Sequence, residues 1–252
     1  AEAETQGSGV EIVVLQNRGA LQDAMIEAAG SGEVALDGRS VSQAVWSRLA
    51  VDLTLASVDS LVATARETKD AAEIERIEAA AGAADAALAE VEPMLFGTID
   101  EPVTEADVRN ELEYRMRRHG ADDRSYDTIV ASGPEHAARP HHEVGDRTIV
   151  AGDTVVIDVG ALVDGYHSDM TRSYVIGEPT AQQREIYDLV QGSQTAGLEA
   201  LRNGVTAPAV DSACRDVFDA AGYGDWYLHG TGHGVGLEIH EPPFHSQVSD
   251  EV

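Results

Sequence analysis

Hydrophobic positions in the first part of the chain alternate between short apolar runs and helical repeats. Continuous apolar runs are typical of strands, whereas apolar residues spaced three and four apart are typical of helices. The expected elements are strands at 10–15 and 33–36 and helices at 19–29, 42–49 and 57–66. This alternation predicts a small α/β unit over residues 1–66, which ends near Glu67–Asp70.

A long helix is predicted to begin after Asp70. Asp70 and Glu73 have the spacing of a capping box, in which each side chain accepts a hydrogen bond from the other residue's backbone N–H. The apolar positions that follow step by three and four: Ile74, Ile77, Ala81, Ala84, Leu88, Val91 and Leu95. Because this face is narrow and rich in alanine, we expect the helix to pack closely on a sheet or another helix.

Capping signals and apolar runs also define the rest of the second region, residues 67–252. Thr104 with Asp107 and Thr180 with Gln183 have capping-box spacing, so a helix is expected after each pair. The second of these helices is expected to end near residue 202 and to be followed by a helix at 206–222. Strands are predicted at 127–131, 154–159 and 166–175. This region therefore has an α+β pattern.

The helix that follows Thr104 carries Val108, Leu112 and Met116 on one face, which we expect to point into the core. It ends in basic residues that precede Gly120, namely Arg115, Arg117, Arg118 and His119. Positive charge at a helix C-terminus complements the helix dipole. We therefore interpret this group as part of the helix end and not as a binding patch.

A β-hairpin is predicted between residues 154 and 175. Its first arm is apolar and β-branched apart from Asp158, and a carboxylate buried in such a strand needs a partner. Asp164-Gly165 is a strong signal for a two-residue turn, which would pair Val163 with Tyr166.

The same register would place Gly160 opposite Asp169, on the face that also carries Asp158. The two carboxylates are then diagonal neighbours, with Cβ atoms roughly 7–8 Å apart, a span that one or two metal ions could close. A turn of odd length would put them on opposite faces. The alternative for this hairpin is one capping or ion-paired aspartate and one exposed aspartate.

Histidines gather in the second region, and the stretch from His229 to His240 holds three of them. Glycine occupies every second position from Gly230 to Gly236, which makes a helix unfavourable. In an extended backbone His229, Thr231 and His233 share one face, and the bare opposite face lets a ligand or another strand approach closely. The alternative is a flexible glycine loop with incidental histidines. Two aspartates and one histidine would suit Mn²⁺, Co²⁺, Fe²⁺ or Zn²⁺.

Composition adds a strong acidic bias. The net charge is −28, from 17 Lys+Arg against 45 Asp+Glu, and Lys69 is the only lysine. Such a surface repels nucleic acid and anionic membranes, and salt should relieve its self-repulsion. The bias resembles proteins of extreme halophiles, with a moderately acidic mesophilic protein as the alternative.

The single cysteine, Cys214, excludes an internal disulfide and fits a reducing compartment, so a cytoplasmic location is expected. It falls on the apolar stripe of the helix at 206–222, where we expect a small core residue. No apolar run approaches the ~20 residues that span a membrane.

Several short motifs follow one another in the second region. They are Pro140-His141, Gly152-Asp153, Ile157-Asp158, the stretch 165–172 and the stretch 232–242. Together they resemble the pita-bread metallopeptidases, the creatinase and methionine aminopeptidase superfamily. The form Gly-Leu-Glu-Ile-His-Glu-Pro at 236–242 is most similar to the Xaa-Pro aminopeptidase and prolidase branch. The resemblance covers roughly Lys69 to the end, and residues 10–66 resemble the latter part of that family's N-terminal domain.

The resemblance implies an α+β pita-bread fold over 67–252, preceded by part of a small α/β domain over 1–66. It also implies two divalent metal ions, with Mn²⁺ expected and Co²⁺, Zn²⁺ or Fe²⁺ as alternatives. Asp158, Asp169 and His233 match metal ligands, and Asp169 matches the ligand that bridges both ions.

The other histidines differ in what the resemblance implies. His141 matches an active-site histidine on the leaving-group side of the substrate, and His229 and His240 match histidines that line the pocket and hydrogen-bond the peptide. Glu241 belongs to the motif but does not match a metal ligand. The histidines that match no essential position, and that we expect at the surface, are His136, His142, His167 and His245.

One departure from the family pattern concerns the metal ligands. The family's site includes two further glutamates downstream of the His240-Glu-Pro motif, and no matching motif occurs before Val252. The chain also begins with Ala1 and not with methionine. We therefore expect a fragment that lacks both ends, binds metal weakly and turns over little or no substrate.

The resemblance implies hydrolysis of the N-terminal peptide bond of Xaa-Pro peptides by a hydroxide bound between two metal ions, in a homodimeric enzyme. Another hydrolase of the same fold, such as a methionine aminopeptidase or a creatinase, is one alternative. A pita-bread module that binds peptide or protein without catalysis is the other.

Overall fold

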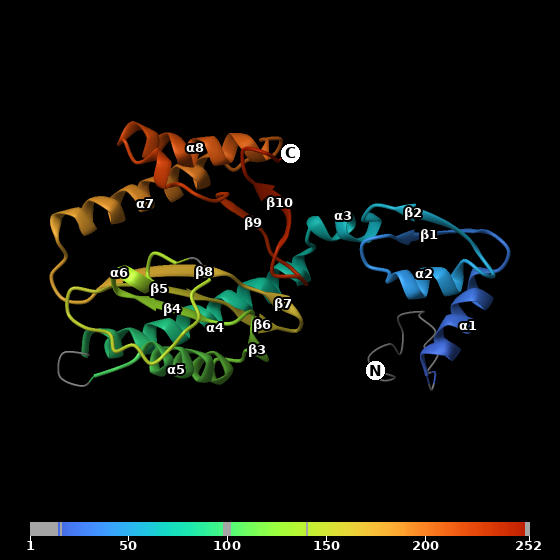
Figure 1. The fold of residues 1–252 in the computed structure, drawn as a ribbon, viewed down its shortest axis with the longest axis horizontal. Helices are drawn as coiled ribbons and strands as arrows, with labels where there is room; N and C mark the ends of the chain where they lie inside the picture. Colours follow the sequence, from blue (N-terminus) through green and yellow to red (C-terminus); the bar gives the residue numbers. More distant parts are fainter. Residues whose placement is uncertain (1–14, 16, 98–101, 140, 250–252) are drawn as a thin grey trace. The chain divides into compact units, whose positions relative to one another are not determined.

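The computed structural model describes residues 15, 17–97, 102–139 and 141–249 of the chain. The chain forms two compact units, residues 1–65 and residues 66–252, whose helices and strands are labelled in Figure 1. Within this described part, no helix combines the length and the apolar content needed to cross a membrane.

The first unit is built around two parallel strands. Its elements are α1 (Arg18–Ala29), β1 (Glu33–Asp37), α2 (Gln43–Leu49) and β2 (Thr54–Val58), and α3 (Leu61–Glu67) follows. Strand β1 pairs with β2 in parallel, and α2 forms the crossover that parallel strands require. The predicted α/β pattern is confirmed here, although the sequence prediction lacks β2 and places the start of α3 too early. The strand expected at 10–15 lies almost wholly outside the described residues.

The second unit combines helices with small antiparallel sheets. The helices are α4 (Ala71–Gly97), α5 (Glu105–Arg118), α6 (Gly133–His136), α7 (Ala181–Ala200) and α8 (Ala207–Ala220), with a 3₁₀ turn at Gly224–Trp226. The strands are β3 (Asp123–Arg124), β4 (Ile129–Ser132), β5 (Thr154–Val159), β6 (Ala161–Val163), β7 (Tyr166–His167), β8 (Met170–Val175), β9 (Gly232–Gly234) and β10 (Glu241–His245). The sheet orders are β4-β5-β8, β3-β6-β7 and β9-β10.

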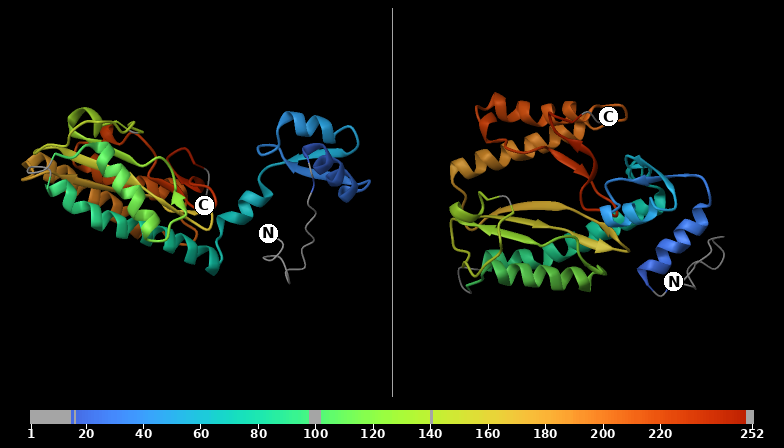
Figure 2. Two further views of the ribbon diagram at one scale, coloured as in Figure 1. Left: turned by 90° about the horizontal axis from the view of Figure 1, so that it is seen from below. Right: turned by 45° about the vertical axis from the view of Figure 1, so that its right-hand side comes forward.

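Helices α4 and α5 pack side by side along one face of the β4-β5-β8 sheet (Figures 1 and 2). All of the side chains predicted to point inward from α5 are fully buried. On α4 the predicted face is confirmed at Ala84, Leu88, Val91 and Leu95. It is wrong at Ile74, which remains 46% exposed, because the buried face of α4 begins only at Ala80.

The three predicted capping boxes are present. Asp70 and Glu73 exchange hydrogen bonds of 2.8 and 2.9 Å, and the Thr104–Asp107 and Thr180–Gln183 pairs form reciprocal caps of α5 and α7. Each cap satisfies backbone N–H groups that a helix start leaves without a partner.

The basic end of α5 is held by ion pairs with acidic side chains. Arg115 contacts Glu90 at 2.5 Å and Glu111 at 2.6 Å, and His119 contacts Glu90 at 2.8 Å. Arg117 pairs with Asp123. These contacts agree with the interpretation of this group as a helix end.

Helices α7 and α8 pack against each other, and α8 also contacts β10. Cys214 lies in this interface with 1% of its surface exposed, which confirms that it is a core residue. The hydroxyl of Ser193 on α7 donates to the carbonyl oxygen of Cys214 at 3.0 Å. This packing supports the segment that carries the glycine-rich stretch.

Candidate metal centre

The predicted hairpin register is confirmed. Strand β6 pairs Val163 with Tyr166, and β5 pairs Val159 with Met170 in the same register. The register places Asp169 across from Gly160, diagonal to Asp158. The hairpin is interrupted here, between β7 and β8, where a side chain at Gly160 would overlap the carbonyl oxygen of Ser168.

A tyrosine that the sequence analysis did not single out links the two aspartates. The hydroxyl of Tyr126 lies 2.6 Å from Asp158 Oδ1 and 3.0 Å from Asp169 Oδ1. Tyr126 precedes β4, in which Ile129 pairs with Asp158. Its position directly before a strand that pairs with the Asp158 strand is the sequence signal that could have identified it.

The glycine-rich stretch brings His233 to the same place. His233 lies on β9, and its Nε2 atom is 3.3 Å from Asp169 Oδ2, with both side chains about a quarter exposed. The ring of His240 meets that of His233 edge-on, with centroids 4.4 Å apart. Potential ligand atoms of Asp169, His233 and His240 all lie within 4.8 Å of one another.

The bare face of this stretch allows a close strand approach, as the sequence predicted. Gly234 pairs with Glu241 of β10, and a Cβ atom at Gly234 would lie 2.6 Å from the carbonyl oxygen of Pro242. Only glycine leaves room for this approach. The pairing of β9 with β10 holds His233 and His240 next to each other.

The charges of the centre are strongly coupled. Burial, and then the charge of Asp169, raise the pKa of Asp158 despite the hydrogen bond from Tyr126. Burial also opposes ionisation of Asp169, but hydrogen bonds from His233 and Tyr126 outweigh it and lower the pKa of Asp169. The hydrogen bond to Asp169 in turn raises the pKa of His233. The two carboxylates thus face the hydroxyls of Tyr126 and Thr171 and one imidazole, so added positive charge would stabilise the group.

A pocket of about 600 Å³ opens over the aspartates. Its lining includes Tyr126, His141, Asp158, Asp169 and His240. His141 is exposed on the loop after α6 and has a positive φ of 55°.

The structure does not bring His229 into this lining. His229 precedes β9, its side chain is exposed, and its Nδ1 atom lies 2.7 Å from the carbonyl oxygen of Gly230.

Buried ion pairs, which the sequence analysis missed, hold the glycine-rich stretch. Asp211 is fully buried and accepts hydrogen bonds from the backbone N–H and the hydroxyl of Thr231, at 3.1 and 2.8 Å. Arg215 contacts Asp211 at 2.6 Å and donates to the carbonyl oxygen of His229 at 2.6 Å. An i,i+4 spacing of acid and base on α8 was the available signal.

A second set of pairs holds the other end of the stretch. Glu241 contacts Arg66 at 2.6 Å and Lys69, the only lysine, at 2.8 Å. Its carboxylate also accepts the backbone N–H of Glu238 at 3.0 Å. These contacts explain the place of Glu241 in the motif, because it fixes the segment next to His240.

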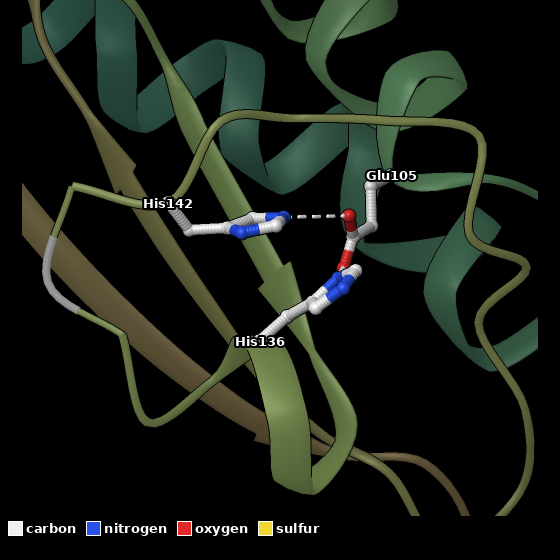
Figure 3. Close-up of side chains that lie close together, drawn as sticks. All are labelled: Glu105, His136 and His142. Atoms are coloured by element: carbon white, nitrogen blue, oxygen red, sulfur yellow. Dashed lines mark hydrogen bonds and ion pairs between the residues drawn. The ribbon is translucent and has the colours of Figure 1, made fainter.

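The surface position expected for the remaining histidines is wrong for His142 and His136. Their side chains are only 8% and 23% exposed, because both contact the buried carboxylate of Glu105 (Figure 3). His167 is also partly buried, and its Nδ1 atom lies 2.8 Å from the hydroxyl of Ser125. Hydropathy alone does not show that a distant helix supplies an acid to these histidines.

Comparisons with known proteins agree with this geometry. The profile of metallopeptidase family M24 matches residues 75–252. The Xaa-Pro dipeptidase of Pyrococcus furiosus is 43% identical over 196 residues, which cover 77% of this chain and 55% of that relative. The chain therefore spans little more than half the length of this relative.

Solved structures extend the likeness to the whole chain. The Xaa-Pro dipeptidase from Bacillus anthracis superposes with a TM-score of 0.90 at 35% identity, covering 100% of this chain and 70% of that chain. The X-Pro aminopeptidase from Thermotoga maritima superposes with a TM-score of 0.83 at 32% identity, covering 96% and 68%. These likenesses confirm the α+β pita-bread fold. On the profile match and the fold together, the chain belongs to metallopeptidase family M24.

Proposed function

We propose that the whole protein is a metal-dependent peptidase that cleaves the N-terminal peptide bond of peptides with proline at the second position. The observation that carries this proposal is the convergence of Asp158, Asp169 and His233 beside one pocket. The substrate class rests on relatives named Xaa-Pro dipeptidase and X-Pro aminopeptidase.

Asp158, Asp169 and His233 would hold a pair of divalent ions. The two oxygens of Asp169 face in different directions, Oδ1 toward Tyr126 and Oδ2 toward His233, which suits a ligand shared by both ions. Bound divalent ions would polarise the scissile carbonyl and lower the pKa of a water molecule. Because carboxylates outnumber imidazoles in this set, Mn²⁺ is the proposed metal.

The histidines would act on the peptide. His240 lines the pocket beside His233 and would donate a hydrogen bond to the oxygen on which negative charge develops. His141 lines the same pocket and would contact the leaving-group side of the substrate. His229 would bind the peptide from the loop before β9.

The wider setting is also part of the proposal. Residues 1–66 would be part of a small N-terminal α/β domain, and residues 67–252 would form the metallopeptidase domain. With 45 acidic against 17 basic residues, the protein would work in concentrated salt, as a cytoplasmic homodimer.

Peptide hydrolysis by the whole protein tests the proposal. The metal-free protein would be loaded with Mn²⁺ in molar KCl and given Ala-Pro, Ala-Pro-Ala and Ala-Ala-Ala. We expect release of alanine from a proline-containing peptide only, with Ala-Pro identifying a dipeptidase and Ala-Pro-Ala an aminopeptidase. Asp169→Ala should reduce the activity by about 100-fold or more, and the distant His119→Asn should leave it unchanged.

Three results would contradict the proposal. Mn²⁺ binding in a calorimetric titration without release of any residue would indicate a non-catalytic module. Release of methionine from Met-Ala peptides, or hydrolysis of creatine, would assign another branch of the fold.

A further inference from the structure

A second group of histidines and a carboxylate lies apart from the candidate metal centre and shares no residue with it. Glu105, the first residue of α5, is fully buried, and His136 and His142 approach its two oxygens from different sides (Figure 3). His136 Nδ1 lies 2.9 Å from Oε1, and His142 Nε2 lies 3.0 Å from Oε2. The potential ligand atoms of these three side chains lie within 4.8 Å of one another.

The charge of Glu105 has no permanently charged partner in this group. Ser132 donates its backbone N–H and its hydroxyl to Oε1, each at 2.7 Å. The nearby guanidinium of Arg147 contacts both oxygens of Asp153, at 2.6 and 3.0 Å, so its charge is matched there. A buried carboxylate is costly without a compensating charge. A metal ion bound between the two imidazoles and the carboxylate would supply such a charge directly at Glu105.

We propose that Glu105, His136 and His142 bind one Zn²⁺ ion, which takes the place of the protons between the imidazoles and the carboxylate. Two imidazoles and one carboxylate form a ligand set that zinc uses, with a fourth position open. Zinc bonds of about 2.0–2.1 Å separate the ligand atoms of a tetrahedron by about 3.3 Å. The observed separations of 2.9 and 3.0 Å are close to that value, so small ring movements would admit the ion.

The chemistry of this group differs from that of the candidate metal centre. Here imidazoles outnumber carboxylates, which favours zinc over manganese. The stacked rings of His136 and His142, with centroids 4.0 Å apart, also disfavour two imidazolium ions side by side. One divalent ion would satisfy both rings and the carboxylate at once.

The ion would fix a wall of the pocket. It would tie the start of α5 to the end of α6 and to the loop that follows, where His142 comes directly after His141. Both histidines line the pocket, and the positive φ of His141 is an unfavourable conformation that needs support from its surroundings. The role is structural, and it does not depend on the proposed peptidase activity.

Calorimetric titration of the full 252-residue chain with Zn²⁺ tests the site. Asp169→Ala serves as the parent, because it removes a ligand of the other centre. We expect this parent to bind one equivalent of Zn²⁺. Adding His136→Asn or His142→Gln should weaken binding by at least roughly 100-fold, more than the loss of an outer partner usually costs.

These substitutions are chosen to keep the hydrogen bonds of the cluster. The amide nitrogen of asparagine replaces Nδ1 of His136, and that of glutamine replaces Nε2 of His142, so each variant still donates to Glu105. His119→Asn in the same parent is the matched control, because it removes a histidine that also contacts a glutamate, Glu90. It should bind Zn²⁺ as the parent does.

Co²⁺ binding is a second measurement, and it remains informative if the histidine variants do not fold, because it needs only the parent. The Asp169→Ala parent should show the visible absorption bands of four-coordinate Co²⁺, and limited proteolysis at 137–146 should slow when Zn²⁺ is added. Absence of Zn²⁺ binding and of the Co²⁺ bands in the parent would overturn the proposal. So would binding that is unchanged by both His136→Asn and His142→Gln.

Discussion

The two carboxylate clusters of the second unit, around Asp158 and around Glu105, shift the pKa of their buried acid in opposite directions. At Asp158, burial and the neighbouring charge of Asp169 raise the pKa of the carboxyl group. At Glu105, burial also opposes ionisation, but hydrogen bonds from Ser132, His136 and His142 outweigh it and lower the pKa. The folded chain therefore destabilises the charge of Asp158 and stabilises that of Glu105.

This difference shows what each cluster contributes without metal. The Glu105 cluster already acts as a structural junction, because every oxygen has donors from other segments. The Asp158 and Asp169 pair has too few donors for its charge, which is typical of a site kept for a ligand at the expense of stability.

The largest expected effect follows from removing the junction. Glu105→Ala should lower the free energy of unfolding of the metal-free chain by about 3–5 kcal/mol, because it leaves the donors of Ser132 and the imidazole of His142 buried without an acceptor. Urea denaturation in the presence of a chelator measures this change. The exposed Glu78→Ala is the control and should change the free energy by less than about 0.5 kcal/mol. Equal effects of the two substitutions would contradict the structural role of Glu105.

The register of the hairpin shows how far the sequence predicts the candidate metal centre. The Asp164-Gly165 turn and the alternation of faces placed Asp158 and Asp169 together, because pairing geometry follows from local turn chemistry. The placement of His233 beside Asp169 came instead from a resemblance, since nothing local sets how β9 approaches the hairpin.

The Glu105 cluster marks the limit of the sequence analysis. Its three side chains come from α5, α6 and the following loop, and no periodicity relates them. Glu105 reads as an ordinary acid in the first turn of a capped helix, which is where acids are favoured on any helix. Its burial depends on tertiary packing, so the sequence alone predicts surface positions for the histidines around it.

Replacing each acid by its isosteric amide should change the free energy of unfolding in opposite directions at the two clusters. Asp158→Asn relieves an unfavourable charge, so the metal-free chain should gain roughly 0.5–1 kcal/mol once solvent screening is allowed for. Glu105→Gln removes a favourable charge and should cost about 1–2 kcal/mol. Thermal unfolding in a chelator measures both. A loss of stability in Asp158→Asn would show that Tyr126 and His233 already compensate the pair, and would break the contrast.

The smallest expected effect is a change with pH in the difference in unfolding free energy between each amide variant and the unsubstituted chain, of about 1 kcal/mol or less. The pKa of Glu105 is lower in the folded chain than the unfolded value of about 4.3, so the unfolded chain takes up the proton first as the pH falls. The stability advantage of the unsubstituted chain over Glu105→Gln should therefore shrink below about pH 4.

The pKa of Asp158 is higher in the folded chain than the unfolded value of about 3.9, so the folded chain takes up the proton first. The advantage of Asp158→Asn over the unsubstituted chain should also shrink on acidification, as the pH falls through the raised pKa of Asp158 in the folded chain. Urea denaturation of the three metal-free proteins between pH 3 and pH 7 would test both trends, and differences that stay constant over the range would mean that neither carboxyl group changes its pKa on folding.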